Sequence, residues 1–185
     1  MVQLPARRTR EPFPALLEAI AHQQLAGAAA KAIWNRVLGL FPEGRPDPLH
    51  LAGLSDEHLR GAGLSRNKAL TMKEIAARAL AGEVPDAKCI ARMSEAQIAE
   101  QLTRIRGVGP WTVDMLLIFT LRRPDIMPLN DYGVRKGFQV LYRKRKLPTP
   151  RQLLASAECW RPYRTTAALY LWRIADAPKA GKPTS

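Results

Sequence analysis

The sequence predicts an all-α fold, and three observations support this prediction. Helix-starting signals, in which a short polar residue precedes an apolar run, recur along the whole chain. Apolar residues between these signals follow helical spacing. Strand signals are nearly absent, because the 185 residues contain no alternating β-branched run and no Asn-Gly or Asp-Gly turn. A chain of this length can bury one good core or two small helical lobes.

The first half of the chain contains the signals for four helices. Residues 14–38 are expected to form one alanine-rich helix whose apolar residues, among them Leu25, face a core. An amphipathic stretch over 65–81 predicts another helix, and Gly82 is placed to end it. The N-cap residues that mark helix starts are Asp47 (followed by Pro48), Ser55 and Ser65.

Two capping boxes mark helix starts in the second half. In such a box a Ser or Thr and a Gln or Glu three residues later satisfy each other's backbone N–H groups. The last helix is expected over residues 163–175, and the segments 1–9 and 177–185 are expected to be flexible tails. The boxes are Ser94 with Gln97, before the apolar positions Ile98, Leu102 and Ile105, and Thr149 with Gln152.

The chain carries a large excess of positive charge. Its 29 Lys and Arg residues against 16 Asp and Glu residues give a formal net charge of +13 and a pI near 10.4. Such an excess favours a polyanionic partner, because Lys and Arg neutralise phosphates and release their condensed counterions. Charge alone does not distinguish a nucleic acid from a ribosome or a membrane surface.

Composition excludes several classes of function. The two cysteines, Cys89 and Cys159, form no CxxC pair, which excludes a four-cysteine zinc site and an iron–sulfur cluster. The three histidines fall in no recognisable metal-binding motif, so metal chemistry is not expected. No apolar run is long enough to span a bilayer, and the N-terminus lacks the hydrophobic segment of a secretory signal. We therefore expect a reducing compartment. With a nucleic acid as the polyanionic partner, this is the cytoplasm beside the nucleoid or, in a eukaryote, the nucleus.

The most informative stretch is residues 98–121, IAEQLTRIRGVGPWTVDMLLIFTL. One helix is expected to end at Ile105, and a second helix to open at Pro110 or Trp111. The two glycines of the GVG turn permit a sharp bend and the close approach of another backbone. The first N–H groups of the second helix then point outward, where a phosphate can accept hydrogen bonds.

A bare GxG turn is more often an ordinary helix corner in a core. Here the apolar positions of both bounding helices match the helix-hairpin-helix DNA-binding motif, which grips the phosphate backbone without reading sequence. Two arginines beside the turn add positive charge. The residues expected to contact the DNA backbone are Arg104, Arg106, Gly107, Val108, Gly109 and Thr112.

A carboxylate follows the hairpin at a helix start. The loop RRPDIMPLN leads to DYGVRKGF, in which Asp131 lies 22 residues after Gly109. The first N–H groups and the dipole of the helix that follows stabilise a negative charge there. Taken alone, Asp131 is better explained as an N-cap. Two other carboxylates lie nearby: Asp114, expected to be a structural partner of an Arg or a backbone group, and Asp125, expected to be exposed.

The order of hairpin, second helix, Pro-containing loop and helix-starting Asp resembles the helix-hairpin-helix glycosylase superfamily. In that family the Asp follows the last Gly of the hairpin at a nearly fixed interval. Within it the chain is most similar to the AlkA-type 3-methyladenine DNA glycosylases, over about residues 12–176. The segments that carry the resemblance are IAHQQLAGAAAKAIWNRV (20–37), LRGAGLSRNKALTMKEIA (59–76), LTRIRGVGPWTVDMLL (102–117), PLNDYGVRKG (128–137) and WRPYRTTAALYLW (160–172).

The resemblance implies a monofunctional DNA glycosylase of base excision repair. Such an enzyme flips an alkylated purine, of the 3-methyladenine or 7-methylguanine type, out of duplex DNA and hydrolyses its N-glycosidic bond. Breaking this bond builds positive, oxocarbenium-like charge on the sugar, which a fixed carboxylate at Asp131 would stabilise while it orients or deprotonates water. Relatives that also nick the strand use a Lys just after the hairpin. Trp111 stands at that position, so lyase activity is not expected.

The resemblance also implies an aromatic pocket for the flipped base. N-alkylated purines carry positive charge, which electron-rich rings attract. Trp34 and Trp160 are instead expected in the core. The expected pocket residues are Trp111, Trp172, Tyr132, Tyr170 and Met115, the last of which replaces a Tyr of the family pattern and so leaves the substrate range open.

The architecture implied by the resemblance is a single module over residues 10–176, with two helical lobes around a DNA-binding cleft. Lobe one is expected over about 38–121, ending in the hairpin, and lobe two over about 10–37 plus 122–176. The family places the residue that fills the gap left by the flipped base in the QQL segment. Gln24 or Leu25 is therefore the expected wedge.

The expected partner is duplex DNA containing damaged bases, bound by a monomer and without any membrane. No cofactor is expected for the chemistry, although the resemblance allows a monovalent cation on the hairpin carbonyls that would act in binding only. The basic run 143–146 either follows phosphates or is a solvated helix end. Two other functions stay open: a non-catalytic helix-hairpin-helix DNA-binding module, and a glycosylase with lyase activity on oxidised or mismatched bases.

Overall fold

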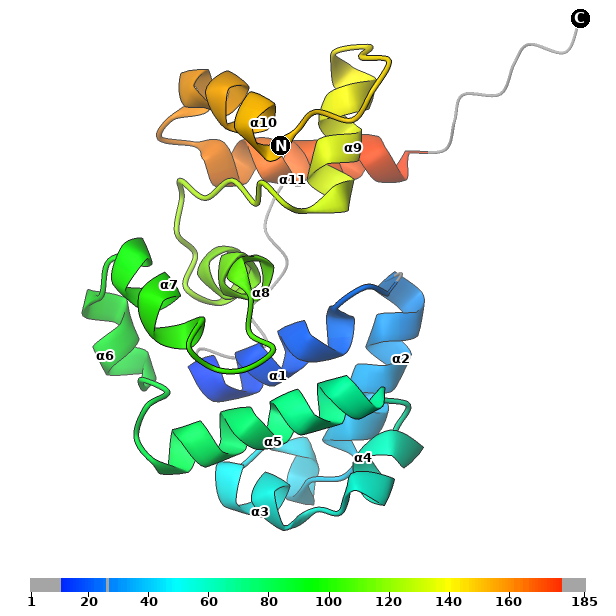
Figure 1. Cartoon of the computed structure of the whole chain (residues 1–185), viewed down its shortest axis with the longest axis vertical. Coiled ribbons are helices and arrows are strands. Elements are labelled where there is room, and N and C mark those ends of the chain that lie inside the picture. Colours follow the sequence, from blue (N-terminus) through cyan, green and yellow to red (C-terminus); the bar gives the residue numbers. More distant parts are fainter. Residues whose placement is uncertain (1–10, 26, 178–185) are drawn as a thin grey trace, which may run out of the picture. The chain divides into compact units, whose positions relative to one another are not determined.

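The structure is a computed structural model, and it describes residues 11–25 and 27–177 (Figure 1). Every regular element within these ranges is helical, which confirms the predicted all-α class. The chain divides between Leu121 and Arg122 into two compact units, called here the N-terminal unit and the C-terminal unit. The expected tails over 1–9 and 177–185 lie outside the described residues, apart from Ala177.

The helices are short, and most are joined by loops of a few residues. In the N-terminal unit the described elements are α1 (Pro12–His22), α2 (Gly27–Leu38), η1 (Pro42–Gly44), α3 (Pro48–Gly53), α4 (Asp56–Gly61), α5 (Arg66–Leu80), α6 (Ala87–Arg92), α7 (Glu95–Leu102), α8 (Pro110–Met115) and η2 (Leu116–Thr120), a π-helical turn that continues α8. In the C-terminal unit they are α9 (Tyr132–Leu141), α10 (Pro150–Ala157), η3 (Glu158–Trp160) and α11 (Arg164–Asp176).

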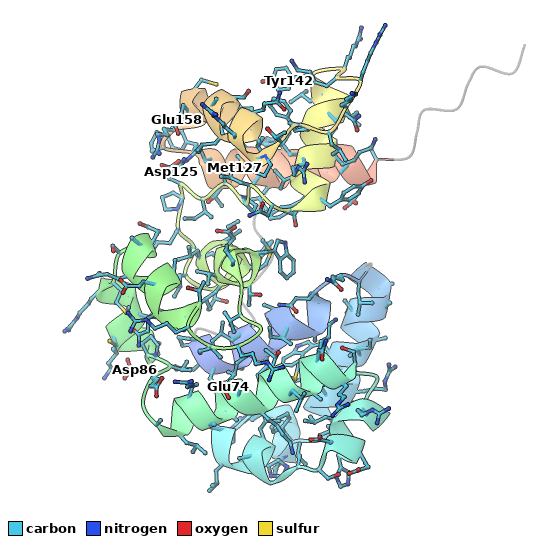
Figure 2. The ribbon with its side chains drawn as sticks, viewed as in Figure 1. Glu74, Asp86, Asp125, Met127, Tyr142 and Glu158 are labelled. Carbon is cyan, nitrogen blue, oxygen red and sulfur yellow. The ribbon has the colours of Figure 1, made fainter. Side chains whose placement is uncertain are left out.

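The predicted helix starts are confirmed by N-cap hydrogen bonds. In each, a side-chain oxygen accepts from the N–H group three residues later, a donor that has no partner within the helix. Both predicted capping boxes are closed in both directions. Within the described residues the structure adds one N-cap hydrogen bond that the sequence analysis did not predict, that of Asp86 before α6, which is labelled in Figure 2. The confirmed N-caps are Asp47, Ser55, Ser65, Ser94, Asp131 and Thr149.

The prediction of one helix over residues 14–38 is wrong, because α1 ends at His22 and α2 begins at Gly27. At the break Gln24 has a positive φ of 58°, and Leu25, expected in the core, is 41% exposed. The ammonium group of Lys68 donates to carbonyl oxygens at the end of α1. This donor comes from a distant part of the chain, so an alanine-rich sequence gave no local sign of the break.

The helix α1 lies along α5 within the N-terminal unit (Figure 1), and it also packs against α2, α8 and η2. Leu16 and Leu17 of α1 are fully buried, as are Met72 and Ile75 of α5. The structure thus differs from the expected division, which grouped residues 10–37 with the C-terminal helices. Periodicity predicts that an apolar face is buried, but it does not identify the helices that cover that face.

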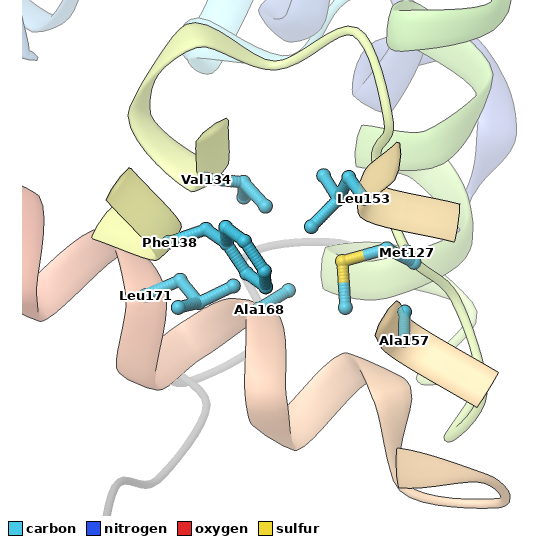
Figure 3. Packing of buried hydrophobic residues seen from close by; sticks show 7 residues of the cluster. All are labelled: Met127, Val134, Phe138, Leu153, Ala157, Ala168 and Leu171. Atoms are coloured by element: carbon cyan, nitrogen blue, oxygen red, sulfur yellow. The ribbon is translucent and has the colours of Figure 1, made fainter. Parts of the chain in front are cut away.

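The C-terminal unit is built on the close packing of α9 against α11. The helices approach because Gly137 has no side chain: a Cβ there would overlap the backbone carbonyl of Leu171. Trp160 packs against the core of this unit, and Trp34 is buried in the N-terminal unit, as predicted. The core residues of the C-terminal unit, shown in Figure 3, are Met127, Val134, Phe138, Leu153, Ala157, Ala168 and Leu171.

We expect Gly137→Ala to destabilise the protein by about 3 kcal/mol or more, because the added methyl group meets backbone atoms that no rotamer change can move. Gly61→Ala is the matched control, since Gly61 also lies in a helix and nothing lies within 4 Å of its Cβ position. Thermal unfolding of both variants and the wild type measures the difference. Equal midpoints for the two variants would show that the packing of α9 on α11 does not depend on this glycine.

Candidate active site

Asp131 ends the loop 122–131 and caps the N-terminus of α9. Its half-buried side chain accepts two hydrogen bonds at Oδ1, from the backbone N–H of Val134 at 2.8 Å and from the indole Nε1–H of Trp172 at 2.7 Å. The first donor belongs to α9 and the second to α11. Two helices of the C-terminal unit therefore fix the orientation of this carboxylate, through hydrogen bonds that its negative charge strengthens.

Gly133 makes room for the hydrogen bond between Trp172 and Asp131. A Cβ at Gly133 would lie 2.7 Å from Trp172 Cδ1, 3.1 Å from Trp172 Nε1 and 3.2 Å from Asp131 Oδ1. Contacts under 3.0 Å force atoms to move, so a side chain at this position would push the indole away from the carboxylate. In the segment DYGVRKGF one glycine thus serves the candidate site and the next, Gly137, serves the helix packing beneath it.

The aromatic residues expected around Asp131 differ in their exposure. Trp172 is half-buried, and it packs against the core of the C-terminal unit while its N–H group meets Asp131. Tyr132 is 67% exposed and Tyr170 is 44% exposed. Trp172 is therefore a rigid neighbour of the carboxylate, whereas the two tyrosines have side chains open to solvent.

The loop that carries Asp131 is fastened at its other end by the start of α11. The guanidinium of Arg164 donates to both carboxylate oxygens of Asp125, at 2.7 Å (Nε to Oδ1) and 3.0 Å (Nη2 to Oδ2). Thr165 Oγ1 donates to the carbonyl of Arg123 at 2.7 Å and accepts from the N–H of Ile126 at 3.0 Å. These contacts hold residues 123–126 against α11.

The prediction that Asp125 is exposed is wrong, since only 25% of its side-chain surface is accessible. The hydrogen bond from Arg164 is the main reason why the pKa of Asp125 lies below its ordinary value, with a further contribution from the charge of Arg161. Arg161 also pairs with Glu158, and its hydrogen bond lowers the pKa of that carboxyl. Figure 2 shows Asp125 and Glu158 at the same end of the C-terminal unit.

The two glycines of the hairpin differ in backbone conformation and in the space around them. Gly107 has a positive φ of 86°, and a Cβ there would overlap the side chain of Thr71 in α5. Gly109 has φ −99° and ψ 176°, which any residue adopts, and nothing lies within 4 Å of its Cβ position. Of the two glycines, only Gly107 therefore needs the positive φ that glycine permits. The fold requires Gly107, whereas no contact within the described N-terminal unit requires Gly109.

The structure buries the side chains of two hairpin residues that are expected to contact DNA. Val108 and Thr112 are 3% and 1% exposed, so their side chains pack inward. Helix α7 also ends at Leu102 instead of Ile105, although Ile105 is buried as expected. Side chains at these positions shape the turn from within, and the surface of the turn is left to the glycines and the arginines.

The arginines beside the turn are exposed, and Arg104 has an ionic partner. Its Nη2 lies 2.6 Å from Oε1 of Glu100, one helical turn earlier, with about 70% of both side chains exposed. Arg106 is exposed as well. An exposed pair of this kind contributes only a fraction of a kcal/mol, so Arg104 can exchange Glu100 for another anion.

The sequence analysis missed Gln23, whose side chain joins the end of α1 to the hairpin. Its Nε2 donates to Thr112 Oγ1 at 2.9 Å and to the carbonyl oxygen of Gly107 at 3.2 Å. No local pattern identifies such a contact, because the partners lie 84 and 89 residues further along the chain. The expected wedge residues, Gln24 and Leu25, are exposed and follow it directly.

The remaining expected residues lie on α8. Trp111, Asp114 and Met115 are half-buried there, within the N-terminal unit.

Over residues 11–25 and 27–177 no group of three or more His, Cys, Asp or Glu side chains is arranged to hold a metal ion. Within the same described part of the chain, no helix is both long and apolar enough to cross a membrane.

Comparison with known proteins connects this geometry to a family. The model of the HhH-GPD superfamily of base excision DNA repair proteins matches residues 17–162. The chain belongs to the HhH-GPD superfamily. The HhH-GPD match includes the hairpin and Asp131 but ends before Trp172, so the indole donor to Asp131 is identified by the structure and not by the family model.

Individual HhH-GPD relatives cover most of the chain. DNA-3-methyladenine glycosylase 1 of Schizosaccharomyces pombe is 39% identical over 178 residues, which are 94% of this chain and 78% of that protein. The solved structure of the S. pombe 3-methyladenine DNA glycosylase Mag1 in complex with abasic DNA has a TM-score of 0.88 at 40% identity, and the match covers 91% of this chain and 84% of that one. A DNA-3-methyladenine glycosidase from Bacillus halodurans gives a TM-score of 0.78 at 34% identity, covering 95% and 79% of the two chains. An 8-oxoguanine glycosylase/lyase of Clostridium acetobutylicum, at 20% identity and a TM-score of 0.74, shares the fold alone.

The lowered pKa of Asp125 in this HhH-GPD protein makes its contribution to stability dependent on pH. The contribution is fully present above the unfolded pKa of about 4, and it is lost as the pH falls toward the folded-state value. Asp125→Asn should therefore reduce the free energy of unfolding by about 1–3 kcal/mol at pH 7, with the deficit shrinking below pH 4. Urea unfolding at pH 7, 4 and 3 measures this.

The control is Asp86→Asn, an exposed N-cap at which Asn caps equally well. The free energy of unfolding of Asp86→Asn should stay close to that of the wild type at every pH. A deficit of Asp125→Asn that remained constant from pH 7 to pH 3 would contradict the proposed origin of the stabilisation.

Proposed function

We propose that the chain is a monofunctional DNA glycosylase that hydrolyses the N-glycosidic bond of alkylated purines in duplex DNA. The observation that carries the proposal is the half-buried Asp131, held by Val134 and Trp172 at the start of α9 in an HhH-GPD chain. The relatives with 39% and 40% identity are 3-methyladenine DNA glycosylases, which supports 3-methyladenine and similarly alkylated bases as substrates.

In the proposed reaction the bond between C1′ and the purine nitrogen breaks, and its electron pair leaves with the base. A positively charged alkylated purine is neutralised by this electron pair, so it is a good leaving group. Positive charge develops on the sugar, and the carboxylate of Asp131 stabilises it. Water then adds to C1′ and loses a proton, leaving an abasic site. Because two hydrogen bonds already orient Asp131, little rearrangement is needed in the transition state.

The proposed base pocket has Trp172 as its fixed wall. The hydrogen bond to Asp131 holds the indole in place, and electron-rich rings attract cationic purines. Tyr132 and Tyr170 are exposed, so a base can reach their rings. Trp111 and Met115 of α8 remain candidates from the sequence. Since Met lacks the ring and hydroxyl of Tyr, we expect Met115 to affect which bases are accepted.

The proposed contact with the DNA backbone is the hairpin surface around Gly109. The open space at its Cβ position allows a phosphate to approach the main chain, and the exposed Arg104 and Arg106 add positive charge. Gln24 and Leu25 are the proposed wedge, because both are exposed on the segment after α1. We propose that a monomer binds damaged duplex DNA in this way.

A monovalent cation on the hairpin carbonyls would support binding and not the chemistry. The Gly107 carbonyl oxygen already accepts from Gln23, and that of Ile105 accepts from the N–H of Val108. A carbonyl oxygen has a second lone pair, so these contacts leave capacity for an ion. The ion remains a proposal, and it takes no part in the steps above.

We expect Asp131→Asn to keep DNA binding and to lower single-turnover excision at least a hundredfold, about 2.7 kcal/mol of barrier. Asn still caps α9 and still accepts a hydrogen bond, but it carries no charge for the sugar cation. The assay uses duplexes with 3-methyladenine or 7-methylguanine, and the more easily lost 7-methylguanine should show the smaller decrease. Near-normal cleavage by Asp131→Asn would refute the assignment.

Asp47→Asn, at another N-cap, is the matched control and should excise like the wild type. The same assay separates the alternatives. A non-catalytic DNA-binding module would release no base. A glycosylase with lyase activity would nick the strand directly, whereas a monofunctional enzyme leaves an abasic site that breaks only after alkali.

We expect Gly109→Val to weaken binding to damaged and undamaged duplex by a similar factor while the protein melts within a few degrees of the wild type. The backbone angles of Gly109 suit a valine and no protein atom lies within 4 Å of its Cβ position, but the side chain would occupy the space proposed for a phosphate. The dependence of binding on salt should become shallower, because fewer phosphates are contacted. Titrations at two salt concentrations, with thermal melting, measure both effects.

Gly107→Val is the contrasting variant and should lose stability first, since its side chain would overlap Thr71. If Gly109→Val melts and binds undamaged DNA like the wild type, the hairpin is not the backbone contact.

A further inference from the structure

The Gln23 side chain joins two segments that have different tasks in the proposed function. Its Nε2 donates to the Gly107 carbonyl oxygen at 3.2 Å and to Thr112 Oγ1 at 2.9 Å, so it bonds the hairpin on both sides of Gly109. The next two residues, Gln24 and Leu25, are exposed and form the proposed wedge. One residue therefore lies between the phosphate contact and the segment proposed to enter the base stack.

A second set of contacts holds the main chain of Gln23. Lys68 Nζ donates to the carbonyl oxygen of Ala21 at 2.8 Å and to that of Gln23 at 2.7 Å. These carbonyls lie at the C-terminal end of α1, where helix carbonyls lack partners within the helix and attract a cation. Burial lowers the pKa of Lys68. The main chain of Gln23 is thus fixed by α5, while its side chain is fixed by the hairpin.

The shape of the chain after α1 follows from these anchors. The helix stops at His22, and Gln24 takes a positive φ of 58°, a conformation that side chains rarely adopt without support. Leu25 is 41% exposed, although apolar side chains gain free energy from burial. The contacts of Gln23 hold the exposed segment in this form before any DNA is bound.

We infer that Gln23 is a positioning residue that couples the hairpin's hold on the DNA backbone to insertion of the residues 24–25 into the duplex. The inference rests on the proposed function, because it gives the wedge and the hairpin their tasks. When a phosphate is held at Gly109, the bonds from Gln23 set where Gln24 and Leu25 meet the base stack. Loss of these bonds would leave DNA binding intact and would disturb the flipping of the base.

The test compares Gln23→Met with the wild type on two duplexes. Met has nearly the shape of Gln but donates no hydrogen bond. In one duplex the alkylated base faces its normal partner; in the other it faces an abasic-site analogue, so that flipping needs less unpairing. We expect excision of the paired base to fall about ten- to hundredfold, as for a misplaced reacting group. Excision of the unpaired base should fall less than about threefold, because flipping then costs less.

The matched control is Gln101→Met. Gln101 also donates from Nε2 to a backbone carbonyl oxygen of the N-terminal unit, that of Glu83 at 2.8 Å. Gln101→Met should excise the base from both duplexes at the wild-type rate. Thr112→Val, nearly isosteric and buried, breaks one of the two bonds from the hairpin side. Excision of the paired base should fall less for Thr112→Val than for Gln23→Met. The double variant of Gln23→Met and Thr112→Val should excise no more slowly than Gln23→Met alone.

A third readout does not depend on catalysis. With 2-aminopurine placed beside the lesion, fluorescence rises as the neighbouring base leaves the stack, and Gln23→Met should show a smaller rise at saturating protein. If the wild type raises fluorescence more than Gln23→Met does but releases no base, the proposed function is refuted while the coupling is supported. An equal loss of excision on the paired and unpaired duplexes, or identical behaviour of Gln23→Met and Gln101→Met, would overturn the coupling.

Discussion

The distance between α9 and α11 governs the geometry of the candidate site, and two glycines four residues apart in α9 set that distance. Gly137 lies against the backbone at Leu171, and Gly133 lies against the indole of Trp172. Residues four apart lie on one face of a helix, so α9 presents a smooth side to its neighbour. With larger side chains on this face, α11 would stand further away and Trp172 Nε1 could not stay 2.7 Å from Asp131. Helix packing, more than the loop, therefore orients the carboxylate.

Helix α11 acts on the loop 122–131 at both of its ends. Arg164 and Thr165 bind residues 123–126 at its first turn, and Trp172 binds Asp131 two turns later. One rigid element thus sets where the loop begins and where its last side chain points. A carboxylate held in this way meets the general requirement that catalytic groups be oriented before the reaction begins.

The sequence predicted those parts of the molecule that have local causes. N-caps such as Asp47 and Thr149 satisfy donors three residues away, so both the signal and its partner lie within a few letters. The fold class and the helix start at Asp131 followed from the same kind of pattern. The break after α1 could not be predicted, because Lys68 and the hairpin stabilise it from distant positions.

The same distinction applies within the candidate site. The GVG turn predicted a hairpin, but only tertiary contacts separate Gly107, which faces Thr71, from Gly109, which faces open space. Thr112 belongs to the motif pattern, yet it is buried and bonded to Gln23. The pairing of Trp172 with Asp131 joins two residues that are 41 positions apart in the sequence, and it depends on how α11 packs against α9.

The ion pair between Arg104 and Glu100 changes how the net charge of +13 should be understood. An arginine that already has a carboxylate neighbour holds fewer mobile anions than a solitary one. When it moves to a phosphate, it leaves behind an acidic group facing a polyanion. At the proposed DNA contact, Arg104 would therefore contribute less positive charge than a solitary arginine at the same position.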